Sequence, residues 1–311
     1  MSAQPEVAPT AEHRQVTLAA LADMRLNAEP IVMVTAYDHP SAQVAEAAGV
    51  DVVLVGDTAA MTVLGYDSTV PVGMDEMLML AAAVRRGLRT PILVGDMPFG
   101  SYEQSNEQAI SNAQRFVKEA GCDAVKLERG GSSVDRARAI VRAGIPVMGH
   151  VGLTPQTAIA LGGFKAQGRT AGQASAIADE ALALQAAGCF AIVFEALPAA
   201  VTEQLMKAMT IPVIGIGAGP ATDGQVLVFH DLLGIFAGHK PRFVKRFAEL
   251  RERMIEGVAE YAREVRAREY PGAEHIYTID PDELEAFRSY LEQESLARAS
   301  EFGGDWTATE I

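Results

Sequence analysis

The chain has 311 residues, of which 49% are hydrophobic and 21% charged, the balance of a globular protein with a sizeable core. Its formal net charge is −14. Nucleic acids and anionic membranes attract proteins through a positive field, so this charge argues against both as partners.

The first residues and the cysteines set further bounds. Residues 1–14 are polar and rich in proline and alanine, and we expect a disordered tail there. The tail lacks the basic and then apolar order of a signal peptide, and no later apolar run is long enough for a membrane span. We therefore expect a cytoplasmic location. Cys122 and Cys189 each follow a glycine and precede an apolar run, which predicts small buried side chains and no disulfide framework.

A loosely repeated unit runs through the chain. It is clearest in AEAAGVDVVLVGD (45–57), KEAGCDAVKLE (118–128) and LQAAGCFAIVFE (184–195). Each copy has an alanine-rich helix end, a glycine, an apolar run rich in branched residues, and an acid. The glycine suits the position just after a helix, where a left-handed conformation is needed. The apolar runs lack strict alternation, which is typical of parallel strands covered on both faces.

The repeated unit predicts a parallel α/β fold. Strands are expected near residues 31–36, 51–56, 91–96, 123–128, 146–150, 190–195, 212–216 and 228–235, with helices between them. Six to eight such units in one chain indicate a (β/α)8 TIM barrel. A doubly wound open sheet is the alternative, and the barrel is favoured because no break in composition divides the chain.

Two helices are expected after the barrel. Residues 240–269 are predicted to form a long charged helix. In DPDELEAFRSYLEQ, Asp280 is a predicted N-cap, Pro281 the first helical residue, and Glu283 the acid three positions after the cap. The second helix would carry an apolar stripe of three residues: Leu284, Phe287 and Leu291. We expect this stripe to pack on its own barrel, with packing on another subunit as the alternative.

Ionisable residues stand where the predicted strands end. They are Asp57, Asp96, Glu128, Glu195 and His150. The carboxyl ends of barrel strands meet at one mouth, where the chemistry of such barrels is found. A single Asp there could simply cap a helix or turn, but several converging carboxylates repel one another and indicate a bound cation. Carboxylate oxygens without a His or Cys cluster favour Mg²⁺.

Lys126 and Glu128 lie two residues apart, so both side chains should point to the same face of their strand. Charges inside a barrel are costly unless they are paired or used. Glu128 could therefore face a metal and Lys126 an anionic group of the ligand, with a salt bridge between the two as the alternative for Lys126. For His150 we expect a hydrogen bond to substrate, with a structural role as the alternative.

Two glycine-rich segments are less specific. IPVIGIGAGPATDGQ (211–225) has glycines in the pattern G-x-G-x-G followed by proline, a weak match to a dinucleotide motif. Its glycines could form an anion site from backbone N–H groups or allow close packing. GGFKAQGR (162–169) is long enough to be a lid, with Lys165 and Arg169 as candidates for an anionic cofactor tail. A solvated surface loop is the alternative.

Nine segments together resemble one known family. They are VTAYDHPSA, LVGDTAAMTVLGYDSTVPV, GDMPFGSY, AVKLERG, GHVGLTPQ, GGFKAQGR, FEALP, IPVIGIGAGPATDGQVLVFHDLLG and YPGAEHIY. In this order, from about residue 18 to 277, the chain resembles the 3-methyl-2-oxobutanoate (ketopantoate) hydroxymethyltransferase family. The resemblance implies a TIM barrel of the phosphoenolpyruvate/pyruvate superfamily type, with the catalytic domain at 15–277, and a homodecamer. It says nothing about residues 278–311, where the residue pattern predicts a C-terminal extension with one amphipathic helix.

The same resemblance implies a reaction. A hydroxymethyl group would pass from 5,10-methylenetetrahydrofolate to 3-methyl-2-oxobutanoate through a Mg²⁺-stabilised enolate, giving 2-dehydropantoate in pantothenate and coenzyme A biosynthesis. One Mg²⁺ per subunit would be held by Asp57, Asp96 and Glu128, and Glu195 would be the base. The keto acid would contact five residues: Asp57, Thr58, Asp96, Lys126 and His150.

The sequence departs from the family pattern at Thr58, where the family usually has serine after the first metal-binding aspartate; Ala59 and Ala60 follow. Threonine keeps the hydroxyl, so keto-acid binding should be retained. One alternative is another Mg²⁺-enolate enzyme of the superfamily, a mutase or C–C lyase; these usually carry a reactive cysteine on a mobile loop. The other is a non-catalytic keto-acid-binding barrel, which would have no need of the carboxylate of Glu195.

Overall fold

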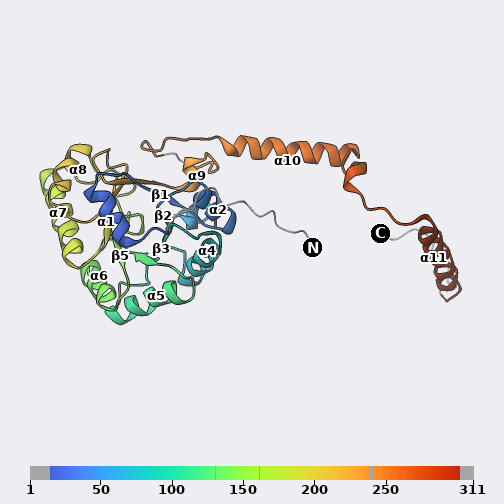
Figure 1. Cartoon of the computed structure of the whole chain (residues 1–311), viewed down its shortest axis with the longest axis horizontal. Coiled ribbons are helices and arrows are strands. Elements are labelled where there is room, and N and C mark those ends of the chain that lie inside the picture. Colours follow the sequence, from blue (N-terminus) through green and yellow to red (C-terminus); the bar gives the residue numbers. More distant parts are fainter. Residues whose placement is uncertain (1–14, 130, 161, 239–240, 302–311) are drawn as a thin grey trace. The chain divides into compact units, whose positions relative to one another are not determined.

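The structure, a computed structural model, describes residues 15–129, 131–160, 162–238 and 241–301. Parallel strands form a closed barrel in which each strand pairs with the next along the chain and the last pairs with the first (Figure 1). The strands are β1 (Ile31–Thr35), β2 (Val52–Val55), β3 (Ile92–Asp96), β4 (Ala124–Lys126), β5 (Val147–Gly152), β6 (Ala191–Glu195), β7 (Val213–Ile216) and β8 (Gly224–Leu227). The predicted (β/α)8 class is confirmed, and the open sheet is excluded.

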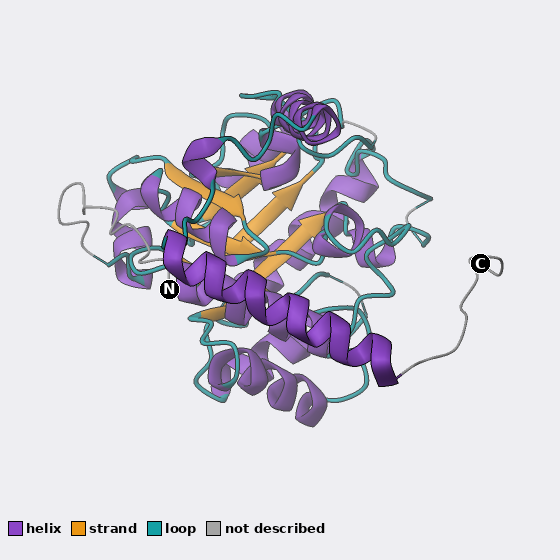
Figure 2. Ribbon diagram, turned by 90° about the vertical axis from the view of Figure 1, so that its right-hand side faces the viewer, coloured by secondary structure: helices purple, strands orange, loops and turns teal. Residues whose placement is uncertain are grey.

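Helices follow the strands and surround them, as the purple ribbons around the orange strands show in Figure 2. They are α1 (Leu18–Leu26), α2 (His39–Ala47), α3 (Ala59–Thr62), α4 (Met74–Gly87), α5 (Asn106–Lys118), α6 (Ser133–Arg142), η1 (Pro155–Thr157), α7 (Ala171–Ala186), α8 (Ala199–Met206) and α9 (Phe229–Leu232). Among the described residues, no helix combines the length and apolar character needed to cross a membrane.

Strand side chains alternate between the barrel interior and the layer beneath the helices. In β2, Val52 and Leu54 belong to the inner apolar cluster, and Val53 and Val55 belong to the outer one. Every residue of this strand is buried. Both faces of the strand are covered, so apolar residues are favoured at every position and do not alternate with polar ones.

Helix α1 covers the end of the barrel at which the strands begin. Its Leu21 belongs to the inner cluster. Its Arg25 forms an ion pair with Asp223, the residue before β8, and donates a hydrogen bond to the carbonyl of Met209. With this end closed, the opposite end, where the strands finish, is left for a site.

The prediction of the eighth strand at residues 228–235 is wrong. The strand is β8, which starts at Gly224, and the helix α9 occupies much of the predicted range. A Cβ atom at Gly224 would lie 2.4 Å from the carbonyl oxygen of Ile31 in β1, so glycine permits the pairing that closes the barrel. The apolar run continues through both elements, and periodicity cannot separate a short strand from a short helix.

The chain divides into two compact units, Met1–Arg251 and Glu252–Ile311. The helices of the C-terminal part are α10 (Leu250–Ala267), η2 (Ala273–His275) and α11 (Pro281–Glu301). Helix α11 begins at Pro281 as predicted, and Asp280 accepts a hydrogen bond of 2.9 Å from the backbone N–H of Asp282. The domain limits at 15–277 and 278–311 stay predictions, and the tail predicted at 1–14 lies outside the described residues.

The predicted helix at 240–269 begins later than expected, because α10 starts only at Leu250. Before it, the backbone N–H of Phe247 donates to the carbonyl of Leu232, at 2.8 Å. That of Leu250 donates to the carbonyl of Leu233, at 2.9 Å. Residues 241–249 therefore run back against the end of α9, a tertiary contact that the charge pattern did not reveal.

Candidate active site

The candidate site residues all line one cavity, of about 1090 Å³, at the end of the barrel where the strands finish. They come from β2 to β6 or from the residues directly after these strands: Asp57, Thr58, Asp96, Lys126, Glu128, His150 and Glu195. The structure thus brings together every residue that the sequence analysis named as metal ligand, keto-acid contact or base.

Lys126 and Glu128 both point into the barrel, because Ala124 of the same strand belongs to the inner cluster and the three residues alternate with outer ones. Lys126 donates hydrogen bonds to both carboxylate oxygens of Asp96, at 2.8 and 2.9 Å. Its ion pair is thus with the neighbouring strand, whereas Glu128 was the partner considered from the sequence.

The buried ammonium of Lys126 is held in its charged form. Burial by itself would lower its pKa, since Lys126 is only 4% exposed. The carboxylates of Asp96, Glu128 and Asp57 outweigh that effect and raise the pKa. Lys126 therefore keeps one positive charge among these three acids at neutral pH.

The three acids exceed that single positive charge. Burial, and then the charges of Asp96 and Glu128, raise the pKa of Asp57 well above its usual range. Glu128 is 1% exposed, and its Oε1 atom has no hydrogen-bond partner. In the described part of the chain, no three His, Cys, Asp or Glu side chains already form a closed ligand cluster. The repulsion among the carboxylates that helps to raise the pKa of Asp57, and the unpartnered hard oxygen of Glu128, nevertheless fit a divalent cation such as Mg²⁺.

Gln156 of η1 links the acids to one another, although the sequence analysis did not identify it. Its Nε2 atom donates to Asp57 Oδ2 at 3.1 Å and to the carbonyl of Met97 at 3.0 Å. Its backbone N–H donates to Glu128 Oε2 at 3.0 Å. Its own Oε1 accepts a hydrogen bond of 2.7 Å from the hydroxyl of Tyr102. Gln156 therefore fixes the separation of two acids from different strands.

His150 lies between two carboxylates. Its Nδ1 atom is 3.6 Å from Glu128 Oε1, and its Nε2 atom is 3.2 Å from Glu195 Oε2. Neither contact has hydrogen-bond geometry, so the attraction is chiefly between charges. Burial and the nearby Lys126 would lower the pKa of His150, but the two carboxylates raise it to about 9. The imidazole is therefore charged at neutral pH and holds Glu195 in position.

The backbone around Glu195 also requires particular residues. Gly152 has φ +100°, and a Cβ atom there would lie 2.1 Å from the carbonyl oxygen of Glu195. The next residue, Leu153, donates its backbone N–H to that same oxygen at 2.9 Å. After Glu195, Ala196 adopts φ +50°, a conformation that L-residues rarely take. Close pairing of β5 and β6 thus sets the position of Glu195 beside His150.

Thr58 is oriented by a neighbouring hydroxyl. Its Oγ1 atom lies 2.7 Å from the hydroxyl oxygen of Tyr37, a residue that is 1% exposed. Of the three residues that depart from the family pattern, only Thr58 lines the cavity, while Ala59 and Ala60 are fully buried. Thr58 is therefore the part of this departure that lines the ligand space.

The predicted lid segment at 162–169 does line the cavity in part. Phe164 and Lys165 are among the lining residues, and Arg169 is not. The backbone N–H of Gln167 donates to the carbonyl of Ala196 at 2.9 Å, which fixes the segment beside Glu195. Of the two candidates for an anionic tail, Lys165 is thus the one placed at the cavity.

The G-x-G-x-G segment serves close packing. A Cβ atom at Gly217 would lie 2.5 Å from the ring of Phe243, and one at Gly219 would lie 2.7 Å from Ala199. Both glycines have positive φ and line the cavity. The ring of Phe243 rests against Gly217, so the glycine fixes an aromatic wall of the cavity. This is one of the two interpretations left open from the sequence.

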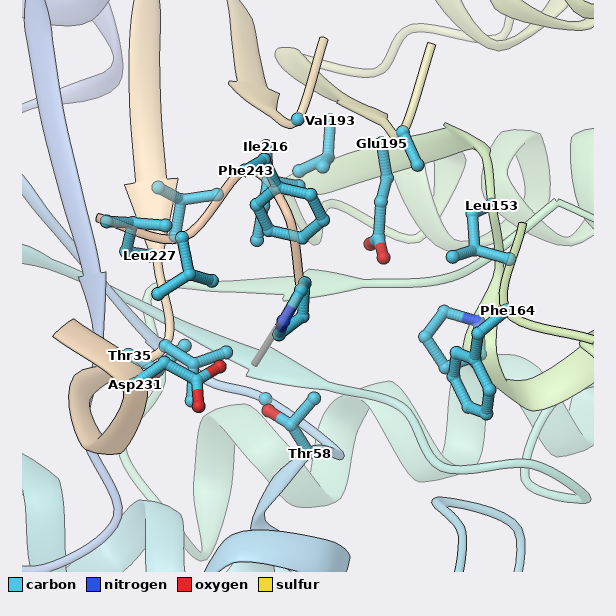
Figure 3. Close-up of a pocket in the computed structure, with 18 of the residues that line it drawn as sticks. Thr35, Thr58, Leu153, Phe164, Val193, Glu195, Ile216, Leu227, Asp231 and Phe243 are labelled. Atoms are coloured by element: carbon cyan, nitrogen blue, oxygen red, sulfur yellow. The ribbon is translucent and has the colours of Figure 1, made fainter. Parts of the chain in front are cut away.

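Asp231 is a further lining residue that the sequence analysis missed. It lines the same cavity as Thr35, Thr58 and Glu195, all of which are labelled in Figure 3. It is the last residue of the run VLVFHD (226–231), and its position beyond β8 depends on where that strand ends. Phe243, from the segment between α9 and α10, was missed for a similar reason.

Comparison with known proteins decides the family. The family model described as ketopantoate hydroxymethyltransferase matches residues 15–273. The chain belongs to this family. It is 49% identical over 271 residues to the 3-methyl-2-oxobutanoate hydroxymethyltransferase of Carboxydothermus hydrogenoformans, covering 87% of this chain and 98% of that protein. It is 47% identical over 299 residues to the mitochondrial 3-methyl-2-oxobutanoate hydroxymethyltransferase 1 of Arabidopsis thaliana, covering 94% of this chain and 86% of that protein.

The fold of this chain is similar to that of several solved barrel structures. A complex of phosphonopyruvate hydrolase with oxalate and Mg²⁺ matches with a TM-score of 0.55 at 13% identity, over 93% of this chain and 100% of that one. 2,3-Dimethylmalate lyase, a member of the PEP mutase/isocitrate lyase superfamily, matches with a TM-score of 0.52 at 16% identity, over 90% of this chain and 98% of that one. At these identities the likeness shows the fold alone, which is a (β/α)8 barrel like those of the solved structures.

Proposed function

We propose that the protein is a 3-methyl-2-oxobutanoate hydroxymethyltransferase. It uses 5,10-methylenetetrahydrofolate to convert 3-methyl-2-oxobutanoate into 2-dehydropantoate, a step of pantothenate biosynthesis. The observation that carries the proposal is the layout of one cavity, in which buried acids and Lys126 lie at one side and Glu195 stands apart beyond His150. Membership of the family supplies the identity of the substrates.

The acid-rich side is suited to the keto acid. Asp57, Asp96 and Glu128 would hold Mg²⁺, which when bound supplies Lewis-acid polarisation of the 2-oxo group. Lys126 remains charged among these acids and provides a positive partner for the carboxylate of the keto acid. Thr58, oriented by Tyr37, offers a hydroxyl at the edge of the same space.

Glu195 takes the proton from C3 of the keto acid. Its side chain is 15% exposed, so it reaches the cavity while part of it is shielded from water. His150 lies 3.2 Å away and fixes the carboxylate from behind. Leu153, Val193 and Phe164 line the cavity nearby and exclude water from the carbanion side of the substrate (Figure 3).

The proposal is tested by two measurements on the full chain. In the first, 2-dehydropantoate formation is followed with both substrates and Mg²⁺. In the second, exchange of the C3 proton for deuterium is followed by NMR. We expect Glu195→Gln to slow exchange by roughly 10²–10⁴-fold while keto-acid binding persists. Glu203→Gln, a change at an exposed position of α8, is the matched control. Wild-type exchange rates in Glu195→Gln would place the base elsewhere.

The alternative enzymes of the superfamily fit less well. Cys122 and Cys189 are free and buried, at 3% and 2% exposure, just before β4 and β6. Burial raises the pKa of each thiol to about 12, so neither is a reactive cysteine. A non-catalytic barrel would bind the keto acid without Mg²⁺-dependent exchange at C3, and the NMR experiment separates that case as well.

Two further expectations accompany the proposed function. The homodecamer inferred from the family resemblance stays a prediction, which sedimentation velocity of the full chain would check. The cytoplasmic location also stays a prediction, and fractionation of cells producing the protein would check it.

A further inference from the structure

The cavity is larger than a small keto acid requires. Ligand sites of roughly 300–1,000 Å³ enclose drug-sized molecules, and this one measures about 1090 Å³. The acids and Lys126 occupy one part of its wall. Other parts of the wall include the segment after β8 and the loop at 162–169, which together form a second part. This second part can hold a larger molecule beside the keto acid.

Among the described residues, Asp231 is the one carboxylate in that second part of the wall. It is partly buried, and burial raises its pKa while Arg246 opposes the rise. The Nη1 atom of Arg246 lies 3.0 Å from Glu249, and its Nε atom has no hydrogen-bond partner in the part of the chain that the structure describes. Within the described ranges, no side chain forms a hydrogen bond or an ion pair of 4 Å or less with Asp231. Its two oxygens therefore remain able to accept hydrogen bonds from a ligand.

We propose that Asp231 binds the 2-amino, N3–H edge of the pteridine ring of the one-carbon donor, an inference that rests on the function proposed above. This edge presents two parallel N–H donors, and a carboxylate presents two matching acceptors, so the pair forms a bidentate contact. Thr58 and Asp231 line the same cavity (Figure 3), so a ring held by Asp231 shares that space with the keto acid. The transferred carbon then lies between the two substrates.

Phe243 supplies a surface for the flat ring. Its own ring is placed by contact with Gly217, whose missing side chain makes room for it. Phe243 is 36% exposed and lines the cavity, so one part of the aromatic surface is open to the ligand space. Aromatic rings in such a position favour offset or edge contacts with a second ring.

The charged residues of the wall match the two ends of a folate in sign and position. A folate carries neutral N–H donors at the pteridine end and carboxylates at the glutamate end. Asp231 lies in the partly buried part of the wall, whereas Lys165 and Arg242 are exposed lining residues. The donor edge therefore meets an acceptor inside the cavity, and the carboxylates meet two cations toward solvent.

The test compares the binding of two ligands to the wild-type full chain and to its Asp231→Asn variant. Tetrahydrofolate, and an analogue with methyl in place of the 2-amino group, are titrated by calorimetry in the presence of Mg²⁺ and keto acid. We expect Asp231→Asn to weaken tetrahydrofolate binding about 10- to 100-fold, because it loses hydrogen bonds to a charged acceptor. Wild type should bind the methyl analogue about tenfold more weakly than tetrahydrofolate, and Asp231→Asn should distinguish the two ligands less.

Asp179→Asn, at an exposed position of α7, is the matched control and should bind tetrahydrofolate as wild type does. If wild type and Asp231→Asn discriminated equally between the two ligands, the assignment would be overturned. This holds even if Asp231→Asn bound both ligands more weakly than wild type does. Keto-acid binding and the circular dichroism spectrum show whether Asp231→Asn is folded. If wild type neither binds tetrahydrofolate nor forms 2-dehydropantoate, the proposed function itself fails. If wild type binds tetrahydrofolate and forms 2-dehydropantoate, and Asp231→Asn binds both ligands as wild type does, only the inference about Asp231 fails.

Discussion

The two sides of the cavity are built differently. On the side of β2 to β4, Asp57, Asp96, Lys126 and Glu128 are at most 4% exposed and are joined by hydrogen bonds. On the side beyond β8, the wall consists of partly exposed residues such as Phe243, which is 36% exposed. A small charged substrate requires fixed partners at short range, whereas a larger flat molecule is bound by surface contact and a few hydrogen bonds.

Burial explains why the charged residues on the side of β2 to β4 need ion pairs and hydrogen bonds. Charged groups removed from water are stable only when paired and hydrogen-bonded, so each change on that side should be costly. Groups on the second side keep access to water, and changes there should affect binding more than stability. The predictions below test this difference from the largest expected effect to the smallest.

Lys126→Met should have the largest effect on stability. It would leave three buried carboxylates without the ammonium that pairs with Asp96. Breaking one partner of a buried pair costs about 3–5 kcal/mol. Urea unfolding of the metal-free protein would measure the loss, with the exposed Lys118→Met of α5 as control. A loss of less than about 1 kcal/mol would mean that the acids are already protonated or solvated.

His150 should make stability depend on pH. Its folded pKa of about 9 lies above its ordinary value of 6.5. Its contribution is therefore complete below pH 6.5 and is lost as the pH rises through 9, by about 3 kcal/mol in total. In chelator-treated protein, His150→Gln should flatten the fall in unfolding free energy over this pH window. The exposed His275→Gln is the control, and an unchanged slope in His150→Gln would contradict the assigned charge.

Gly152→Ala should disturb the link between β5 and β6. The added Cβ atom would meet the carbonyl oxygen of Glu195 at 2.1 Å, at a φ of +100°. Strain of this kind costs about 2–3 kcal/mol, and the thermal midpoint should fall accordingly. In contrast, Gly172→Ala in α7 meets no atom within 4 Å and should be neutral or slightly stabilising. Equal midpoints for the two variants would show that the backbone at Gly152 adjusts freely.

Gln156→Leu should destabilise the protein by about 1–3 kcal/mol, because it leaves the buried hydroxyl of Tyr102 without its acceptor, and it should also weaken metal binding. It removes the hydrogen bond to Asp57 while the backbone bond to Glu128 can remain. Loss of such an outer contact weakens metal affinity by about tenfold. Calorimetric titration with Mg²⁺ would detect this change, and Gln114→Leu on the exposed face of α5 is the control. Wild-type Mg²⁺ affinity in Gln156→Leu would remove this residue from the metal site.

Much of the candidate site could be predicted from the sequence, because the end of a strand is marked by consecutive residues. Asp57, Asp96, Glu128 and Glu195 each follow an apolar run, and parallel strands in a barrel bring such positions to one mouth. The side beyond β8 was not readable in this way. There the apolar run merges a short strand with a short helix, so the lining position of Asp231 was hidden.

The sequence by itself determined the barrel, the inner face of Lys126 and Glu128, and the family. A repeated βα unit, the two-residue period of a strand and the order of motifs are all properties of the chain read along its length. Only the tertiary structure decided which charges pair. Lys126 pairs with Asp96 because β3 and β4 align Asp96 with Lys126 in register, and Gln156 joins Asp57 to Glu128 from a distant loop. Such partners lie far apart along the chain, so their choice depends on strand register and loop packing, which local sequence patterns do not encode.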